Sequence, residues 1–131
     1  MLTGPGGGET VRFPGGSSTE MKVEATQAGG GYGAIVYTVK AGEEPPLHTH
    51  SREDELVYVI EGELVALVGD ARVPVGPGAF AALPLGVPHT ISVTDEQATL
   101  LLTFVPGGLE RFFVPPPGEE PDPAAFGLTF P

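Results

Sequence analysis

Between residues 32 and 105 the chain is a succession of short apolar runs, rich in β-branched and aromatic residues, each ended by turn residues. Residues 55–61 end at Gly62, and residues 63–68 end at Gly69-Asp70, a pair typical of hairpin turns. No window in this region shows the sustained spacing of apolar side chains that predicts an amphipathic helix. The pattern therefore predicts an all-β domain, either a two-sheet sandwich or a jelly-roll barrel.

The apolar runs place strands at residues 32–41, 55–61, 63–68, 71–75, 79–83, 89–94 and 98–105. A leading strand is expected at residues 21–26 and a weaker one at residues 11–13. Several runs are continuously apolar rather than alternating, which is typical of strands covered on both faces. Such cover could come from a second subunit.

Glycine and proline, 20 and 15 residues respectively, are concentrated towards the two ends of the chain. We therefore expect a barrel domain at residues 21–114, preceded by a flexible or strand-exchanging segment at residues 1–20. A short helical turn is expected at residues 108–113, because the three prolines that follow would stop it. The proline-rich tail, residues 115–131, still carries apolar side chains, so we expect it to pack on its own domain or on a neighbour.

Composition excludes several classes of function. The net charge is −11 with only six basic residues, which argues against a nucleic-acid partner or an anionic membrane surface. The absence of cysteine excludes disulfides, thiolate chemistry and cysteine-based zinc sites. The first residues lack the basic and apolar segments of a signal peptide, and no apolar stretch is long enough to span a membrane. A cytoplasmic location is the expectation.

All the histidines of the chain, His48, His50 and His89, occur near turns or acidic residues. On an extended segment, the i, i+2 spacing of His48 and His50 places both imidazoles on one face. The acidic run 53–55 follows them, and imidazoles beside a carboxylate are typical ligands of a divalent metal. Taken singly, histidines are more often surface or hydrogen-bonded groups, and acidic runs are more often solvated faces.

The spacing of these residues resembles the first motif of the cupin superfamily. That motif runs glycine, five residues, His-x-His, three or four residues, glutamate, six residues and glycine. Here the positions are filled by Gly42, His48, His50, Glu55 and Gly62. The spacing selects Glu55 over Glu53, which lies within the turn.

The second cupin motif runs glycine, five residues, Pro-x-Gly, two residues, histidine, three residues and asparagine. Here Gly78, Pro84, Gly86 and His89 match, and Val93 stands where the family has asparagine. Asparagine is the most variable position of the motif and is no metal ligand. The motif glycines are interpreted as turn residues at the rims of the barrel, where positive φ is favoured.

The resemblance implies a cupin jelly-roll barrel with His48, His50, Glu55 and His89 as ligands of one divalent transition metal facing its interior. Three nitrogens and one carboxylate suit Mn, Fe, Ni, Co, Cu and Zn alike, so the ligands do not name the ion. Residues 107–113 are similar to a segment found in single-domain cupins of the quercetin dioxygenase-like group. The resemblance therefore implies a metal-dependent dioxygenase acting with O₂ on a flavonol-like or other small aromatic or enol substrate.

In that reaction Glu55 would be a catalytic residue as well as a ligand, accepting the proton of a substrate hydroxyl. Two alternatives stay open: a non-enzymatic cupin that binds or senses a small molecule, and an isomerase or decarboxylase acting on a small acid. The second alternative requires a basic side chain in the pocket, so that Arg52, Arg72 or Arg111 would have to point inward.

Several aromatic residues could line a pocket, although aromatic residues on strands more often belong to the core. They are Tyr37, Tyr58, Phe80, Phe104, Phe112 and Phe113. Small cupins commonly dimerise through a sheet edge or an exchanged terminal strand, and we expect a homodimer here.

Overall fold

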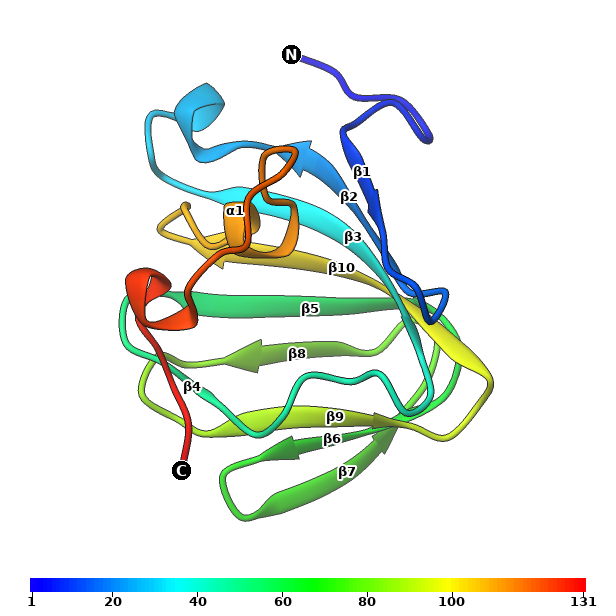
Figure 1. The fold of residues 1–131 in the computed structure, drawn as a ribbon. Coiled ribbons are helices and arrows are strands. Elements are labelled where there is room, and N and C mark those ends of the chain that lie inside the picture. The colour runs from blue at the N-terminus through cyan, green and yellow to red at the C-terminus, as the bar shows by residue number, and fades with distance from the viewer.

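The computed structural model describes residues 1–131 and shows two layers of β-sheet with the core between them (Figure 1). The larger sheet has six strands in the order β1-β2-β3-β10-β5-β8, and all neighbouring strands are antiparallel. Their bounds are Thr10–Arg12 for β1, Ser18–Val23 for β2, Gly33–Lys40 for β3, Gln97–Val105 for β10, Asp54–Glu61 for β5 and Phe80–Leu83 for β8.

The second layer begins with a three-stranded sheet in the order β7-β6-β9. These strands are Ala71–Val75 (β7), Leu64–Val68 (β6) and His89–Val93 (β9). Two short strands, β4 (Thr49–His50) and β11 (Leu128–Thr129), pair with each other. An antiparallel bridge between His48 and His89 links this pair to β9. The predicted all-β jelly-roll class is confirmed.

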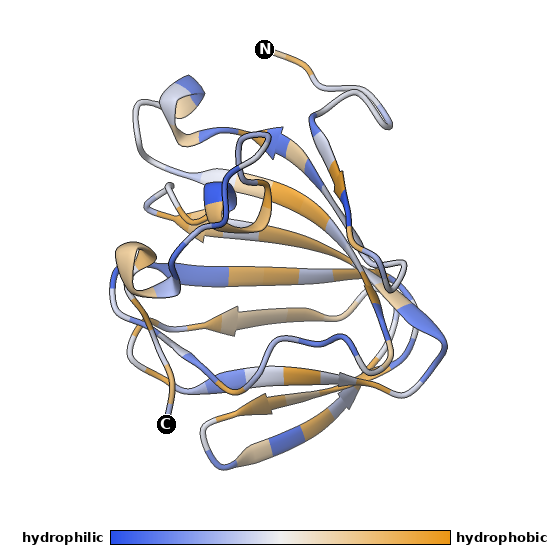
Figure 2. Ribbon diagram, viewed as in Figure 1, coloured by the Kyte–Doolittle hydropathy of each residue, from blue (hydrophilic) through white to orange (hydrophobic).

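The core lies between the layers and follows the period of two that an extended strand imposes. Along β10, the buried residues are Ala98, Leu100, Leu102 and Phe104, and the intervening residues are less buried. Figure 2 shows hydrophobic residues along β3 and β10 and hydrophilic residues at the start of β5. The inner face of the larger sheet is thus mostly apolar, with buried polar residues at Thr19 on β2 and at Glu55 where β5 begins.

The outer face of the larger sheet is apolar along β5 and β8, where it is uncovered in the single chain. Tyr58 and Phe80 lie opposite each other on β5 and β8, with 41% and 64% of their surface exposed. Ile60, on the same face of β5, is 42% exposed. The continuous apolar run of β5 therefore has one face in the core and one in solvent.

Most predicted strands agree with the structure to within one or two residues, but the leading strand does not. The expected strand at residues 21–26 is instead Ser18–Val23, and a 3₁₀ helix (η1, Ala25–Ala28) follows it. The side chains of Glu24 and Gln27 form a capping box there, which ends the extended conformation. Residue 20, the expected end of the N-terminal segment, consequently lies inside β2.

The predicted helical turn is confirmed as α1 (Glu110–Phe113). The tail beyond it contains a second 3₁₀ helix, η2 (Pro123–Phe126), capped by the Asp122 side chain, and then β11. Leu128 of β11 is buried in the core of its own chain. No helix in the structure is both long and apolar enough to cross a membrane.

Candidate metal centre

The candidate ligands come from both layers and meet where β4, β5 and β9 begin. His48 and His89 exchange backbone hydrogen bonds of 2.9 and 3.1 Å across the bridge, which places their side chains next to each other. His50 follows His48 at i+2 and therefore points to the same side. Glu55 is the second residue of β5, in the opposite layer, and it is buried.

The structure brings all four predicted side chains together in a buried cluster, with one potential ligand atom from each lying within 4.8 Å of the others. Glu55 Oε1 lies 3.4 Å from His50 Nε2 and 3.8 Å from His89 Nε2. Two atoms that share one ion, each at about 2.1 Å from it, are separated by roughly 3–4 Å. The two separations between Glu55 and the histidine nitrogens fall within that range.

Hydrogen bonds on the far side of each ring orient the three imidazoles. Nδ1 of His48 donates to the Pro46 carbonyl at 2.7 Å, and Nδ1 of His89 donates to the Val87 carbonyl at 3.2 Å. Nδ1 of His50 donates to Oε1 of Glu53 at 3.1 Å. Because these oxygens only accept hydrogen bonds, the proton of each neutral ring is on Nδ1 and the Nε2 lone pair is free.

The Nε2 atoms provide a test of whether the site fits a metal. In His50 and His89, Nε2 is buried and has no hydrogen-bond partner. A buried polar nitrogen without a partner is costly, and these two lone pairs converge on a carboxylate that cannot donate to them when ionised. A divalent cation would satisfy both nitrogens and the carboxylate, so the residues present fit a metal.

Burial and the neighbouring Glu53 affect the electrostatics of the cluster. Burial lowers the pKa of His48, which keeps this imidazole neutral and available as a ligand near pH 7. Glu53, which the sequence placed in a turn without a role at the site, is buried beside His50. Its i, i+3 spacing from His50 was the only sign in the sequence that the two side chains could meet. The spacing alone does not show that the turn folds back onto the His50 ring.

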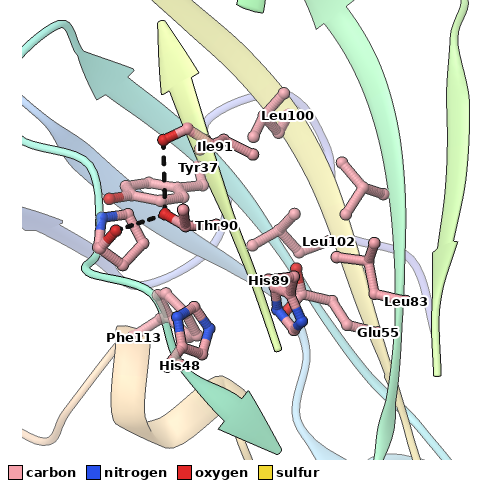
Figure 3. Close-up of a pocket in the computed structure, with 12 residues that line it drawn as sticks. Tyr37, His48, Glu55, Leu83, His89, Thr90, Ile91, Leu100, Leu102 and Phe113 are labelled. Atoms are coloured by element: carbon pink, nitrogen blue, oxygen red, sulfur yellow. Dashed lines mark hydrogen bonds and ion pairs between the residues drawn. The ribbon is translucent and has the colours of Figure 1, made fainter. Parts of the chain in front are cut away.

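A cavity of about 30 Å³ opens next to the cluster, and His48, Glu55 and His89 form part of its wall (Figure 3). The rest of the wall is mostly apolar and comes from both layers. It consists of Tyr37, Pro45, Val57, Leu83, Thr90, Ile91, Leu100, Leu102 and Phe113. The only polar side chains there besides the cluster are those of Tyr37 and Thr90.

The structure places only some of the other predicted pocket residues at this cavity. Of the six aromatic candidates, Tyr37 and Phe113 line this cavity, and Phe104 is core. None of the three arginines considered lines it. Arg111 pairs with Glu9 and Glu24, Arg52 donates to the Ala125 carbonyl, and Arg72 is exposed on β7.

The fold resembles solved cupin structures over most of the chain. KdgF from Halomonas sp. has a TM-score of 0.73 and 15% identity, covering 82% of this chain and 94% of that chain. An RmlC-like cupin from Shewanella frigidimarina has a TM-score of 0.69 and 22% identity, covering 81% and 90%. Oxalate decarboxylase from Bacillus subtilis, a protein with Mn(II) centres, has a TM-score of 0.66 and 27% identity, covering 76% and 28%.

A search of curated proteins finds no significant match to this sequence. The family model described as "Cupin domain", in contrast, matches residues 35–105, more than half of the chain. This range contains all four residues of the cluster and the strands that carry them. The chain belongs to the cupin family.

Proposed function

We propose that this cupin binds one divalent transition metal through His48, His50, Glu55 and His89, and that it is a dioxygenase-type oxidoreductase for a small enol substrate. The observation that carries the proposal is the pair of buried, unpartnered Nε2 atoms facing Glu55 beside an apolar cavity. Four protein ligands would leave open coordination positions on an ion that accepts five or six, as a reactive site requires.

The roles of the residues follow from their positions. The three imidazoles contribute neutral Nε2 lone pairs, each held in place through its Nδ1 hydrogen bond. A bound metal would supply Lewis-acid and redox chemistry for the substrate and O₂. Glu55, whose carboxylate lies at the wall of the cavity, accepts the proton of the substrate hydroxyl.

The cavity itself favours a particular kind of substrate. Its wall is mostly apolar, it contains no lysine or arginine, and its volume is about 30 Å³. These features disfavour a three-ring flavonol, because a volume of about 30 Å³ is that of two or three water molecules. They also disfavour decarboxylation or isomerisation of a small acid, because no cation is present to bind a carboxylate away from the metal.

Two findings bear on whether this chain belongs to the quercetin dioxygenase-like group. The segment that follows β10 folds over the cavity, and Phe113 of this segment lines it. The size of the cavity favours a substrate smaller than the flavonol of that group. The competing function, binding or sensing of a small molecule without turnover, would use the same wall and the same metal.

The test is oxygen uptake by the full-length protein reconstituted separately with Mn, Fe, Co, Ni, Cu and Zn. Single-ring enols serve as substrates, with quercetin as the larger comparison. We expect uptake with at least one metal, faster with the single-ring compounds, and lost in Glu55→Gln but retained in Glu61→Gln, an exposed control on the same strand. If none of the metals supports oxygen uptake, the protein is a binding cupin without turnover. Equal metal content in His89→Ala and the wild type would overturn the metal site itself.

A further inference from the structure

We propose that the Tyr37 hydroxyl donates a hydrogen bond to the substrate, whose class is therefore an apolar ring bearing two oxygens, one for the metal and one for Tyr37. This inference rests on the function proposed above and adds a binding residue outside the cluster of ligands.

Tyr37 is held rigidly in the wall of the cavity. It lies on β3, opposite Leu100 of β10 and Thr19 of β2, and its side chain points into the space between the layers. Its ring packs against Phe113, with 5.8 Å between centroids at a tilt of 55°. Only 8% of the residue is exposed, so the ring has little freedom to swing out.

The other polar groups of the wall are already engaged. The Thr90 hydroxyl donates to the Pro45 carbonyl at 2.6 Å, and Nδ1 of His48 donates to Pro46. An ionised Glu55 carboxylate can only accept. Figure 3 shows Tyr37 and Thr90 on one side of the cavity and leucines on the other. No protein group accepts a hydrogen bond from the Tyr37 hydroxyl, which leaves it as the free donor of this cavity.

The hydroxyl is a neutral donor at physiological pH. Burial raises the pKa of Tyr37 to about 12, and the negative charges of Glu43, Glu44 and Glu55 act in the same direction. No group of the protein accepts from this donor, and phenylalanine would fill the same space in the wall of the cavity. The hydroxyl is therefore available to a ligand that enters the cavity.

The experiment uses the full-length protein loaded with Co(II), whose visible absorption reports its coordination, and tropolone as the probe. Tropolone is a single planar ring with two neighbouring oxygens. Tyr37→Phe keeps the ring and removes only the hydroxyl, and Tyr58→Phe makes the same change on the exposed outer face of β5. We expect Tyr37→Phe to weaken tropolone binding about tenfold, because one hydrogen bond is lost. Tyr58→Phe should leave tropolone binding unchanged.

Two further readouts separate a ligand-binding role from a structural one. Co(II) affinity is expected to be equal in all three proteins, and the melting temperature of metal-free Tyr37→Phe is expected to be unchanged or higher. Unchanged tropolone affinity in Tyr37→Phe, or a marked loss of its stability, would overturn the inference. Co(II) binding without tropolone binding by the wild type would overturn the inference alone, whereas failure to bind Co(II) would overturn the proposed function as well.

Discussion

The Nδ1 atom of His50 lies 3.1 Å from a carboxylate oxygen of Glu53, and the two residues are 1% and 4% exposed. This contact faces away from Glu55, so it fixes the ring with Nε2 directed at the cluster. A carboxylate behind a ligating imidazole also makes the ring a better electron donor. His50 is the only histidine of the three whose Nδ1 partner is a side chain, because the other two use backbone carbonyls.

Replacing Glu53 should therefore weaken metal binding without touching a ligand. We expect Glu53→Ala to reduce the affinity for Co(II) by about 10–100-fold, and Glu53→Gln to reduce it less, because an amide oxygen still accepts the hydrogen bond. Titration calorimetry on the metal-free proteins measures the effect, with Glu61→Gln as the exposed control. Wild-type affinity in Glu53→Ala would show that the contact does not orient His50.

The sequence identified the cluster because its four members lie on motif positions whose spacing reflects strand geometry. His48 and His50 share a face by the period of two, and the turn before His89 returns the chain to them. The short apolar runs, each ended by turn residues, were equally informative, since they correctly distinguished sheet from helix throughout residues 32–105. These are local properties, and local properties can be read from a single sequence.

Glu53 and Tyr37 depend instead on how distant segments pack. Whether a turn residue such as Glu53 faces solvent or a histidine ring is decided by the path of the loop, which spacing alone does not define. Tyr37 lies on the same face of β3 as the core residues Ile35 and Val39, and only the position of Phe113, far along the chain, shows that it borders a cavity. The β4–β11 pair is similar, because its strands are two residues each and too short to leave a pattern.

Metal binding should stabilise the protein measurably. A metal present at 100 times its dissociation constant adds about 2.7 kcal/mol to the free energy of unfolding, because the unfolded chain lacks the preformed cluster. For a domain of this size the melting temperature should rise by roughly 10 °C. Differential scanning calorimetry with Co(II), before and after chelation by EDTA, measures the shift. Glu55→Gln should show a smaller rise, and an equal rise would argue that Glu55 is no ligand.

The metal-free protein should lose stability as the solution becomes acidic. Burial lowers the pKa of His48 in the folded state below its ordinary value of 6.5, so the unfolded chain binds the proton more readily. The contribution of His48 is therefore fully present above about pH 6.5 and is lost as the pH falls below it. Urea unfolding between pH 8 and pH 5 should show a shallower dependence for His48→Asn. Identical pH profiles for the two proteins would contradict this assignment.

The exposed outer face of β5 and β8 predicts a homodimer. Tyr58, Ile60 and Phe80 form an apolar surface there, and large exposed apolar patches mark association sites. Size-exclusion chromatography with light scattering should give twice the 13.5 kDa of one chain. Phe80→Glu should give a monomer, whereas Phe13→Glu, an exposed aromatic residue in a loop outside β5 and β8, should not. A wild-type mass of one chain would rule the dimer out.

The tail should support the metal centre, because β11 pairs with the strand that carries His50. Leu128 lies opposite His50 in the β4–β11 register, and both the amide and the hydroxyl of Ser51 donate to the Gly127 carbonyl. Leu128 is buried, so Leu128→Ala should cost about 2–4 kcal/mol of stability and loosen β4. We therefore expect it to weaken Co(II) binding, whereas Phe130→Ala, at a half-exposed residue of the same tail, should affect neither property. Unchanged Co(II) affinity in Leu128→Ala, measured where the variant is fully folded, would show that β4 holds His50 in place without the tail.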